Sequence, residues 1–205
     1  MIKVLLLFIT LPLLAINIDT NFTHTNTIGS QYYEDTKSVA TYNDILHERL
    51  ESKTITSNLQ PRQYPIWSKF TLYNDTHESK RVFLNNKKSS MDHIEVYILQ
   101  SKKLIKQISL GSNNSKNISK KLHNDFDLLL QPKREYTFII SHTGISPIRP
   151  IWEIYTQERY YHQTMIDYST LGIYVGLLFA LIIYNIMNKT IKAGGSMIIC
   201  EAKLP

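Results

Sequence analysis

The stretch that decides the fold is IWSKFTLY, residues 66–73, in which apolar and polar side chains alternate. Successive side chains of a strand point to opposite faces, so this alternation predicts a β-strand. One face carries Ile66, Ser68, Phe70 and Leu72. The other face carries Trp67, Lys69, Thr71 and Tyr73. A similar pattern recurs along the chain as far as about residue 156.

Six further segments carry strand patterns, and turn-rich joints such as NDTHES and TGISP separate them. They are RVFL (81–84), HIEVYIL (93–99), KLIKQISL (103–110), FDLLL (126–130), EYTFIIS (135–141) and RPIWEIYT (149–156). Seven short strands at this spacing predict a mainly β domain over 38–160, an antiparallel jelly-roll β-sandwich. One short helix is predicted ahead of them, within 38–50, where Thr41 and Asp44 have the spacing of a helix cap.

The N-terminal part carries two different signals. Residues 1–15, MIKVLLLFITLPLLA, combine one lysine with an uncharged run and end in alanine, which predicts a secretory signal peptide. Leu13 fits the cleavage rule poorly, so an uncleaved anchor stays open as the alternative. Residues 16–37 are rich in Asn and Thr, and we expect them to be a flexible leader.

A second uncharged run, LGIYVGLLFALIIYNIM, occupies residues 171–187. With its flanks, over 168–188, it is long enough to cross a membrane as a helix. A buried helix of a soluble core is the alternative, but no other segment is apolar enough to surround it. Lys189 and Lys192 follow the run, so the positive-inside rule makes 189–205 a short cytoplasmic tail and places the sandwich across the membrane.

Small residues recur at four-residue spacing within this run, at Gly172, Gly176 and Ala180. They share one helix face, and small faces of this kind allow membrane helices to pack closely. The spacing therefore predicts a homodimer held through the transmembrane helix.

Composition excludes several classes of protein. A chain of 205 residues holds one domain of ordinary size with appendages, which rules out a tandem multidomain enzyme. The single cysteine, Cys200, allows neither an intrachain disulfide nor a cysteine cluster. The net charge of +6 is modest, and we expect no nucleic-acid partner.

No catalytic signature appears along the chain. The histidines have no HxxxH or HExxH spacing, and there is no GxSxG elbow or phosphate-binding glycine loop. Asp125 and Asp127 lie at strand spacing, which suits a calcium site or acid/base chemistry or, more ordinarily, a solvated strand edge. The sequence therefore predicts no enzyme, no metal and no cofactor.

Two binding signals remain. A basic hairpin that suits anionic lipid or an acidic ligand, or is simply a solvated loop, carries Lys102, Lys103, Lys106, Lys116, Lys120 and Lys121. Four aromatic residues of predicted strands are candidates for a sugar-stacking platform, although such rings more often belong to a core: Trp67, Tyr97, Trp152 and Tyr155.

Several motifs together resemble a known receptor family. They are PIWSKFTLYNDT (65–76), SSMDHIEVYIL (89–99), Gly111, EYTFIISHTGISPIRPIWEIY (135–155) and LGIYVGLLFALIIYNIMN (171–188). Over about 40–188 the chain is similar to bacterial seven-transmembrane receptors with diverse intracellular signalling modules (7TMR-DISM). The similar part is their type-two extracellular domain plus the first membrane helix.

This resemblance implies a periplasmic sandwich, similar to carbohydrate-binding modules, that senses a small-molecule or carbohydrate ligand outside the bacterial inner membrane. Family members pass the bound state through seven helices to an output such as a histidine kinase or a diguanylate cyclase. The family has no catalytic residues in this domain, so none is transferred to this chain.

The chain departs from the family pattern after Asn188, where it reads KTIKAGGSMIICEAKLP and stops. We expect a flexible GGS segment there, and either a truncated or frameshifted receptor gene or a single-span remnant. Two function classes stay open. One is the ligand-sensing input domain of a signalling receptor, and the other is a membrane-anchored structural or adhesive module without a signalling role.

Overall fold

The computed structural model describes residues 15–88, 91–111 and 124–201, with side chains described as far as Lys189. The chain divides into two compact units, one up to Arg159 and one from Tyr160 onward. Each unit is taken by itself below. Except for Ala15, the predicted signal peptide lies outside the described residues.

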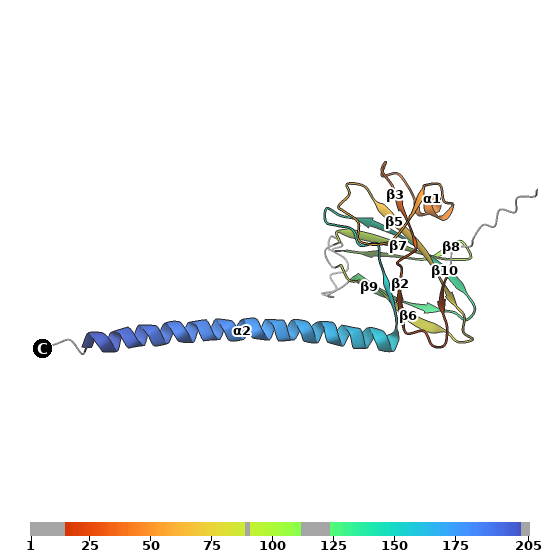
Figure 1. The fold of residues 1–205 in the computed structure, drawn as a ribbon. Coiled ribbons are helices and arrows are strands. Elements are labelled where there is room, and N and C mark those ends of the chain that lie inside the picture. The colour runs from red at the N-terminus through yellow and green to blue at the C-terminus, as the bar shows by residue number, and fades with distance from the viewer. Residues whose placement is uncertain (1–14, 89–90, 112–123, 202–205) are drawn as a thin grey trace, which may run out of the picture. The chain divides into compact units, whose positions relative to one another are not determined.

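Two sheets stack face to face in the first unit (Figure 1). The strands of the larger sheet are β1 Ile16–Ile18, β3 Gln31–Glu34, β4 Ser52–Thr54, β5 Ile66–Asn74, β7 His93–Gln100, β8 Lys103–Leu110 and β10 Glu135–Thr143. The strands of the smaller sheet are β2 His24–Asn26, β6 Lys80–Asn86, β9 Asn124–Leu130 and β11 Glu153–Thr156. Their spatial orders are β4-β3-β5-β10-β7-β8, with β1 also on β5, and β2-β11-β6-β9. The predicted β-sandwich is confirmed.

The alternation in β5 separates two apolar clusters. β5 pairs with β10 over most of its length, from Ile66 opposite His142 to Tyr73 opposite Glu135. Ile66, Phe70 and Leu72 lie in the core between the sheets. Trp67 points the other way, into a second cluster on the outer face of the larger sheet. Both faces of this strand are therefore covered, and neither is simply the solvent face.

The prediction that residues 16–37 form a flexible leader is wrong, because this segment contributes three paired strands. β1 pairs in parallel with Leu72–Asn74, and β3 pairs with Ile66–Lys69 on the same edge of β5. β2 pairs with β11 of the smaller sheet. Ile18 and Tyr33 are buried. Strands of three or four residues are too short to show a period of two, and the longer strands beside them hold them in place.

The short helix α1 Tyr42–Leu46 covers the outer face of the larger sheet (Figure 1). Its predicted cap is confirmed: the Asp44 carboxylate accepts hydrogen bonds from the Thr41 hydroxyl (2.7 Å) and the Thr41 backbone N–H (2.9 Å). These bonds, with one from Arg49, lower the pKa of Asp44 to about 2. The helix lies within the predicted stretch 38–50, and Ser38 and Glu48, both at φ 54°, turn the chain on either side of it.

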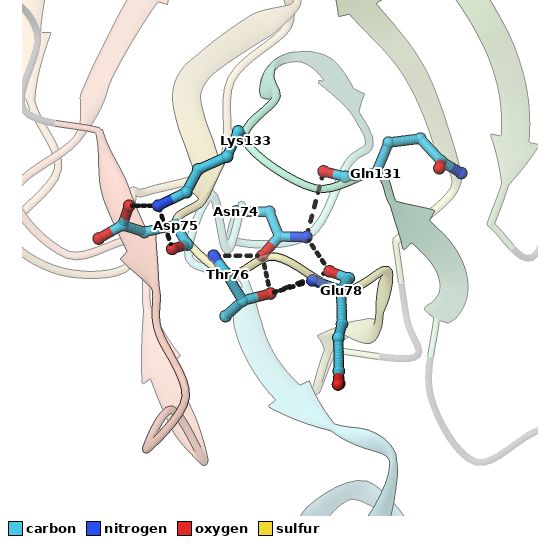
Figure 2. A network of polar contacts seen from close by, with 6 residues as sticks. All are labelled: Asn74, Asp75, Thr76, Glu78, Gln131 and Lys133. Carbon is cyan, nitrogen blue, oxygen red and sulfur yellow. Dashed lines mark hydrogen bonds and ion pairs between the residues drawn. The ribbon is translucent and has the colours of Figure 1, made fainter.

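A polar network fixes one end of the sandwich (Figure 2). The buried Asn74 side chain donates to the backbone carbonyls of Glu78 (2.8 Å), Leu130 (3.1 Å) and Gln131 (3.1 Å). Its oxygen accepts from the Thr76 N–H (3.1 Å) and hydroxyl (2.8 Å). The NDT end of the PIWSKFTLYNDT motif is thus structural, because it ties the turn after β5 to the end of β9.

The helix α2 Gln157–Glu201 follows β11 without an intervening residue and makes up most of the second unit. Within the described residues it is the one helix long and apolar enough to cross a membrane, over Gln157–Lys189. The predicted span, 168–188, lies inside it. The helix also continues through Gly194–Ser196, where we expected a flexible segment. Each glycine costs only about 1 kcal/mol in a helix interior, which need not end the helix.

Candidate ligand-binding site

Two of the predicted platform residues, Trp67 and Tyr97, lie together on the outer face of the larger sheet. Their ring centroids are 6.0 Å apart, and Tyr42 of α1 stacks on Tyr97 at 4.8 Å. Trp67 is only 5% exposed, and its Nε1 has no hydrogen-bond partner in the described part of the chain. Burial raises the pKa of Tyr97, and Glu95 and Tyr42 raise it further. These rings form a packed layer under α1.

Of the other two predicted residues, Trp152 lies in the core between the sheets and Tyr155 lies in β11 of the smaller sheet. Trp152 is fully buried, and its ring meets Phe126 edge-on with centroids 5.6 Å apart. Tyr155 of β11 is 2% exposed and stacks on His24 at 4.5 Å. The structure therefore brings Trp67 and Tyr97 together but separates them from Trp152 and Tyr155. The four rings share no surface.

A buried hydrogen bond explains why Trp152 is where it is. Its Nε1–H donates to Nε2 of His142 at 3.2 Å, and Nδ1 of His142 lies 3.3 Å from the Ile66 carbonyl oxygen. Burial lowers the pKa of His142 to about 4, against smaller opposing effects of backbone hydrogen bonds. The imidazole is therefore neutral, with its proton on Nδ1 and its Nε2 free to accept. This pair belongs to the core and not to a ligand site.

An open hollow of about 300 Å³ lies at the end of the larger sheet where β5 and β7 begin and β10 ends. We call it the Arg62 hollow. It is lined by residues of three segments: Arg62, Gln63 and Tyr64; Asp92 and His93; and Thr143, Gly144 and Ile145. Ile145 is 91% exposed and forms an apolar part of its rim.

Asp92, from the SSMDHIEVYIL segment, shapes this hollow. Its Oδ2 accepts a hydrogen bond from the Ile145 N–H at 2.9 Å. A Cβ added to Gly144 would lie 3.1 Å from the same oxygen, and one added to Gly111 would lie 2.6 Å from the Asp92 carbonyl oxygen. Gly111 also has φ +111°, which favours glycine. Glycine is therefore required at Gly111, and at Gly144 a side chain would fit only if the Asp92 carboxylate shifted slightly.

Arg62 is the cation of the hollow, and its guanidinium makes few hydrogen bonds within the described residues. The side chain is half-buried, and Nη1 donates one long hydrogen bond (3.5 Å) to the Pro61 carbonyl. Its Nε is buried and has no acceptor in the described residues. No carboxylate of the described residues forms an ion pair with the guanidinium. Arg62 was not singled out from the sequence, because no motif contains it.

In two larger hollows, charged side chains of the lining form ion pairs with other residues. One, of about 540 Å³ beside α1, is lined by charged side chains, of which Arg49 pairs with Asp44 (2.7 Å) and Lys53 with Glu34 (3.2 Å), while Lys37 and Glu51 are exposed to solvent. The other, of about 810 Å³, lies beside β1 and β2. There His24 pairs with Glu153 at 2.7 Å. The Arg62 hollow is the better candidate, because its cation is half-buried and has no carboxylate partner among the described residues.

The remaining predicted sites give no alternative. In the described ranges no group of three or more His, Cys, Asp and Glu side chains gathers as a metal site. Asp127 of the D-x-D pair lies 3.7 Å from Arg81 in an ion pair at the surface. Lys102, Lys103 and Lys106 lie in or next to β8, and the other three lysines of the predicted basic hairpin fall outside the described residues.

A protein-family model described as 7TMR-DISM extracellular 2 matches residues 28–156. The match begins just before β3 and ends with β11. No curated protein matches the sequence.

Several solved structures are similar at low identity. The beta-glucuronidase of Ruminococcus gnavus is 8% identical, with a TM-score of 0.37 over 66% of this chain and 29% of that one. A family 35 carbohydrate binding module from an environmental isolate is 11% identical, with a TM-score of 0.28 over 49% of this chain and 69% of that one. The GH31 alpha-xylosidase of Xanthomonas citri is 10% identical, with a TM-score of 0.31 over 66% of this chain and 16% of that one.

Proposed function

Because this chain belongs to the 7TMR-DISM extracellular 2 family, we propose that it is the ligand-sensing input module of a membrane receptor. The family makes it an extracellular-side domain, and α2 supplies one candidate membrane span. The observation that carries the sensing step is the Arg62 hollow. It combines a half-buried guanidinium without a carboxylate partner in the described residues with a volume of about 300 Å³, the lower end of the range for small-molecule sites.

The chain path from the hollow supports this proposal. Gly144 and Ile145, which line the hollow, begin the loop that follows β10. That loop leads into β11, which continues directly into α2. A ligand that changes the conformation of this loop would act on the segment that enters the membrane helix. Differential binding to two states of the loop is what such transmission requires.

We further propose that the sandwich lies in the periplasm of a bacterium, that α2 contacts the lipid bilayer, and that the chain forms homodimers through α2. Gly172 and Gly176 have open space around the position of an added Cβ, which leaves this helix face free for close packing. Most of the large apolar side chains of 171–187 are exposed, as a helix in lipid requires.

Thermal unfolding of the full chain in lipid nanodiscs tests the sensing function. Glucose, galactose, glucuronate, galacturonate, glutamate and glutamine are added singly at about 10 mM, because a ligand that binds only the folded state raises the melting temperature. We expect at least one of these compounds to raise the melting temperature in a saturable manner. No shift with any of them would contradict the proposal.

Two bulky substitutions locate the site. Gln63 is an exposed residue of the Arg62 hollow, and Gln63→Trp should fill part of it and abolish the shift. Thr36 is an exposed residue of the hollow beside α1, and Thr36→Trp is the matched control that should leave the shift unchanged. The reverse pattern would place the ligand beside α1.

A further inference from the structure

We infer that the ligand of the Arg62 hollow carries two groups. One is a carboxylate, which Arg62 binds, and the other is a hydroxyl or ammonium group, which donates a hydrogen bond to Asp92. This inference rests on the proposed sensing function and names the chemical class of its ligand. The class comprises carboxylates of the size of a monosaccharide or an amino acid.

The carboxylate follows from the state of the Arg62 side chain. A guanidinium presents its N–H groups in a planar fork that matches the two oxygens of a carboxylate. Here Nε is buried without an acceptor among the described residues, and Nη1 makes only one hydrogen bond of 3.5 Å. Nε itself is closed to solvent, so a carboxylate in the hollow would bind the terminal nitrogens, which make only that one long hydrogen bond within the described residues.

The second group follows from Asp92. This carboxylate also lines the hollow, and its described hydrogen bond uses Oδ2 for the Ile145 N–H. A ligand that carried only negative charge would be repelled by Asp92, because like charges in a partly buried site destabilise each other. A hydroxyl or ammonium on the same ligand removes that conflict by donating to Asp92.

The size of the ligand follows from the hollow. Its volume of about 300 Å³ suits a single sugar ring or an amino acid, and Tyr64 and Ile145 supply apolar surface beside the charged groups. Tyr64 is held in place by its hydroxyl, which donates to Glu34 at 3.3 Å. Ile145 is held by its N–H bond to Asp92.

Two matched pairs of compounds test the inference by calorimetric titration of the full chain in nanodiscs. Glucuronate is compared with glucose, and glutamine with glutaminamide, so that the second member of each pair lacks the one carboxylate of the first. We expect the carboxylate of at least one pair to bind at least about tenfold more tightly than the partner that lacks it. The pair that responds shows whether the ligand is a sugar acid or an amino acid.

Variants of Arg62 assign the effect to this residue. Arg62→Gln should weaken carboxylate binding by at least about tenfold, and Arg62→Lys should weaken it less, because lysine keeps the charge but lacks the fork. Arg134→Gln removes the same charge from an exposed residue outside the hollow and should change nothing. If Arg62→Gln does not fold, the Arg62 Nε–H resonance of the wild-type protein should shift with sodium acetate and not with sodium chloride.

The outcomes separate this inference from the proposed function. Equal binding of both members of each pair, or undiminished binding by a folded Arg62→Gln, would overturn the carboxylate assignment while the sensing function stands. An Arg62 resonance unmoved by acetate would also overturn it. If no compound of the sensing panel binds at all, the proposed function falls together with the inference.

Discussion

The protonation state of His142 decides whether its ring can accept the hydrogen bond from Trp152 inside the core. Nε2 of His142 accepts from Trp152 at 3.2 Å, and only the neutral imidazole has a free nitrogen for this role. His142 is fully buried, and burial lowers its pKa from 6.5 to about 4. The folded chain therefore binds fewer protons at this residue than the unfolded chain does between these two pH values.

This difference predicts a pH dependence of stability. The contribution of neutral His142 is present in full above pH 6.5 and is lost as the pH falls towards 4, by up to about 3 kcal/mol. Urea unfolding at a series of pH values measures it. His142→Gln should lose less stability over this range than the wild type, and the exposed control His77→Gln should behave as the wild type. Identical slopes for His142→Gln and the wild type would show that another group is responsible.

Trp67 makes the second prediction at this scale. The ring is 5% exposed and packs with Tyr33, Ile45, Leu99 and Ile139. Trp67→Ala should cost roughly 3–5 kcal/mol of unfolding free energy, as large-to-small changes of buried aromatic residues do. Denaturant unfolding gives this value. If the variant keeps its stability and loses ligand affinity instead, Trp67 belongs to a binding surface and its place under α1 is misread.

Among the strands, all those of seven or more residues were predictable from the sequence, and of the shorter ones only β11 was. The patterns at 66–73, 93–99 and 103–110 correspond closely to β5, β7 and β8. The strand predicted at 149–156 is longer than the observed strand β11, which begins only at Glu153. β1 to β4 were missed because three or four residues carry no readable period, and their pairing partners lie far away in sequence.

The short helix and the long helix also differ in what their sequences reveal. The cap of α1 was readable from Thr41 and Asp44, because this pair acts locally. The continuation of α2 past Lys189 could not be predicted from the sequence, because Gly194 and Gly195 suggested a break. Local hydrogen-bonding patterns thus predict where a helix begins better than composition predicts where it ends.

The small face of α2 supplies a prediction at the same scale. If dimers form through Gly172, Gly176 and Ala180, the substitution Gly176→Ile should abolish self-association in a membrane two-hybrid assay, because its side chain would separate the two backbones. Insertion into the membrane should be unchanged, since isoleucine is as compatible with lipid as glycine. Leu178→Ile is a control at a residue outside this set. Association that survives Gly176→Ile would exclude dimerisation through this face.

At the scale of the whole molecule, the sequence located the domain but not its candidate site. The sandwich and the apolar helix follow from periods of side chains along the chain. The Arg62 hollow follows from the meeting of three distant segments, around Arg62, Asp92 and Ile145. Asp92 was noticed as part of a motif, but what it does became visible only with Gly111 and Gly144 closed around it.

The aromatic residues failed as a guide for a related reason. Trp67, Tyr97, Trp152 and Tyr155 were singled out because aromatic rings stack on sugars, but the same rings also fill cores. Trp67 and Tyr97 pack in the cluster under α1, Trp152 lies in the core between the sheets, and Tyr155 belongs to neither cluster and stacks on His24. Which face of a strand is covered depends on the packing of other elements, and a single strand's pattern does not contain that information.

The side of the membrane on which the sandwich lies can be determined from the position of a reporter enzyme fused to the chain. Alkaline phosphatase, which is active only after export, is fused after Tyr161 in one chain and after Lys203 in another. If the sandwich is an extracellular-side domain held by α2, the first fusion should be active and the second inactive, because Lys189 and Lys192 keep the end of α2 in the cytoplasm. Activity only in the second fusion would contradict it.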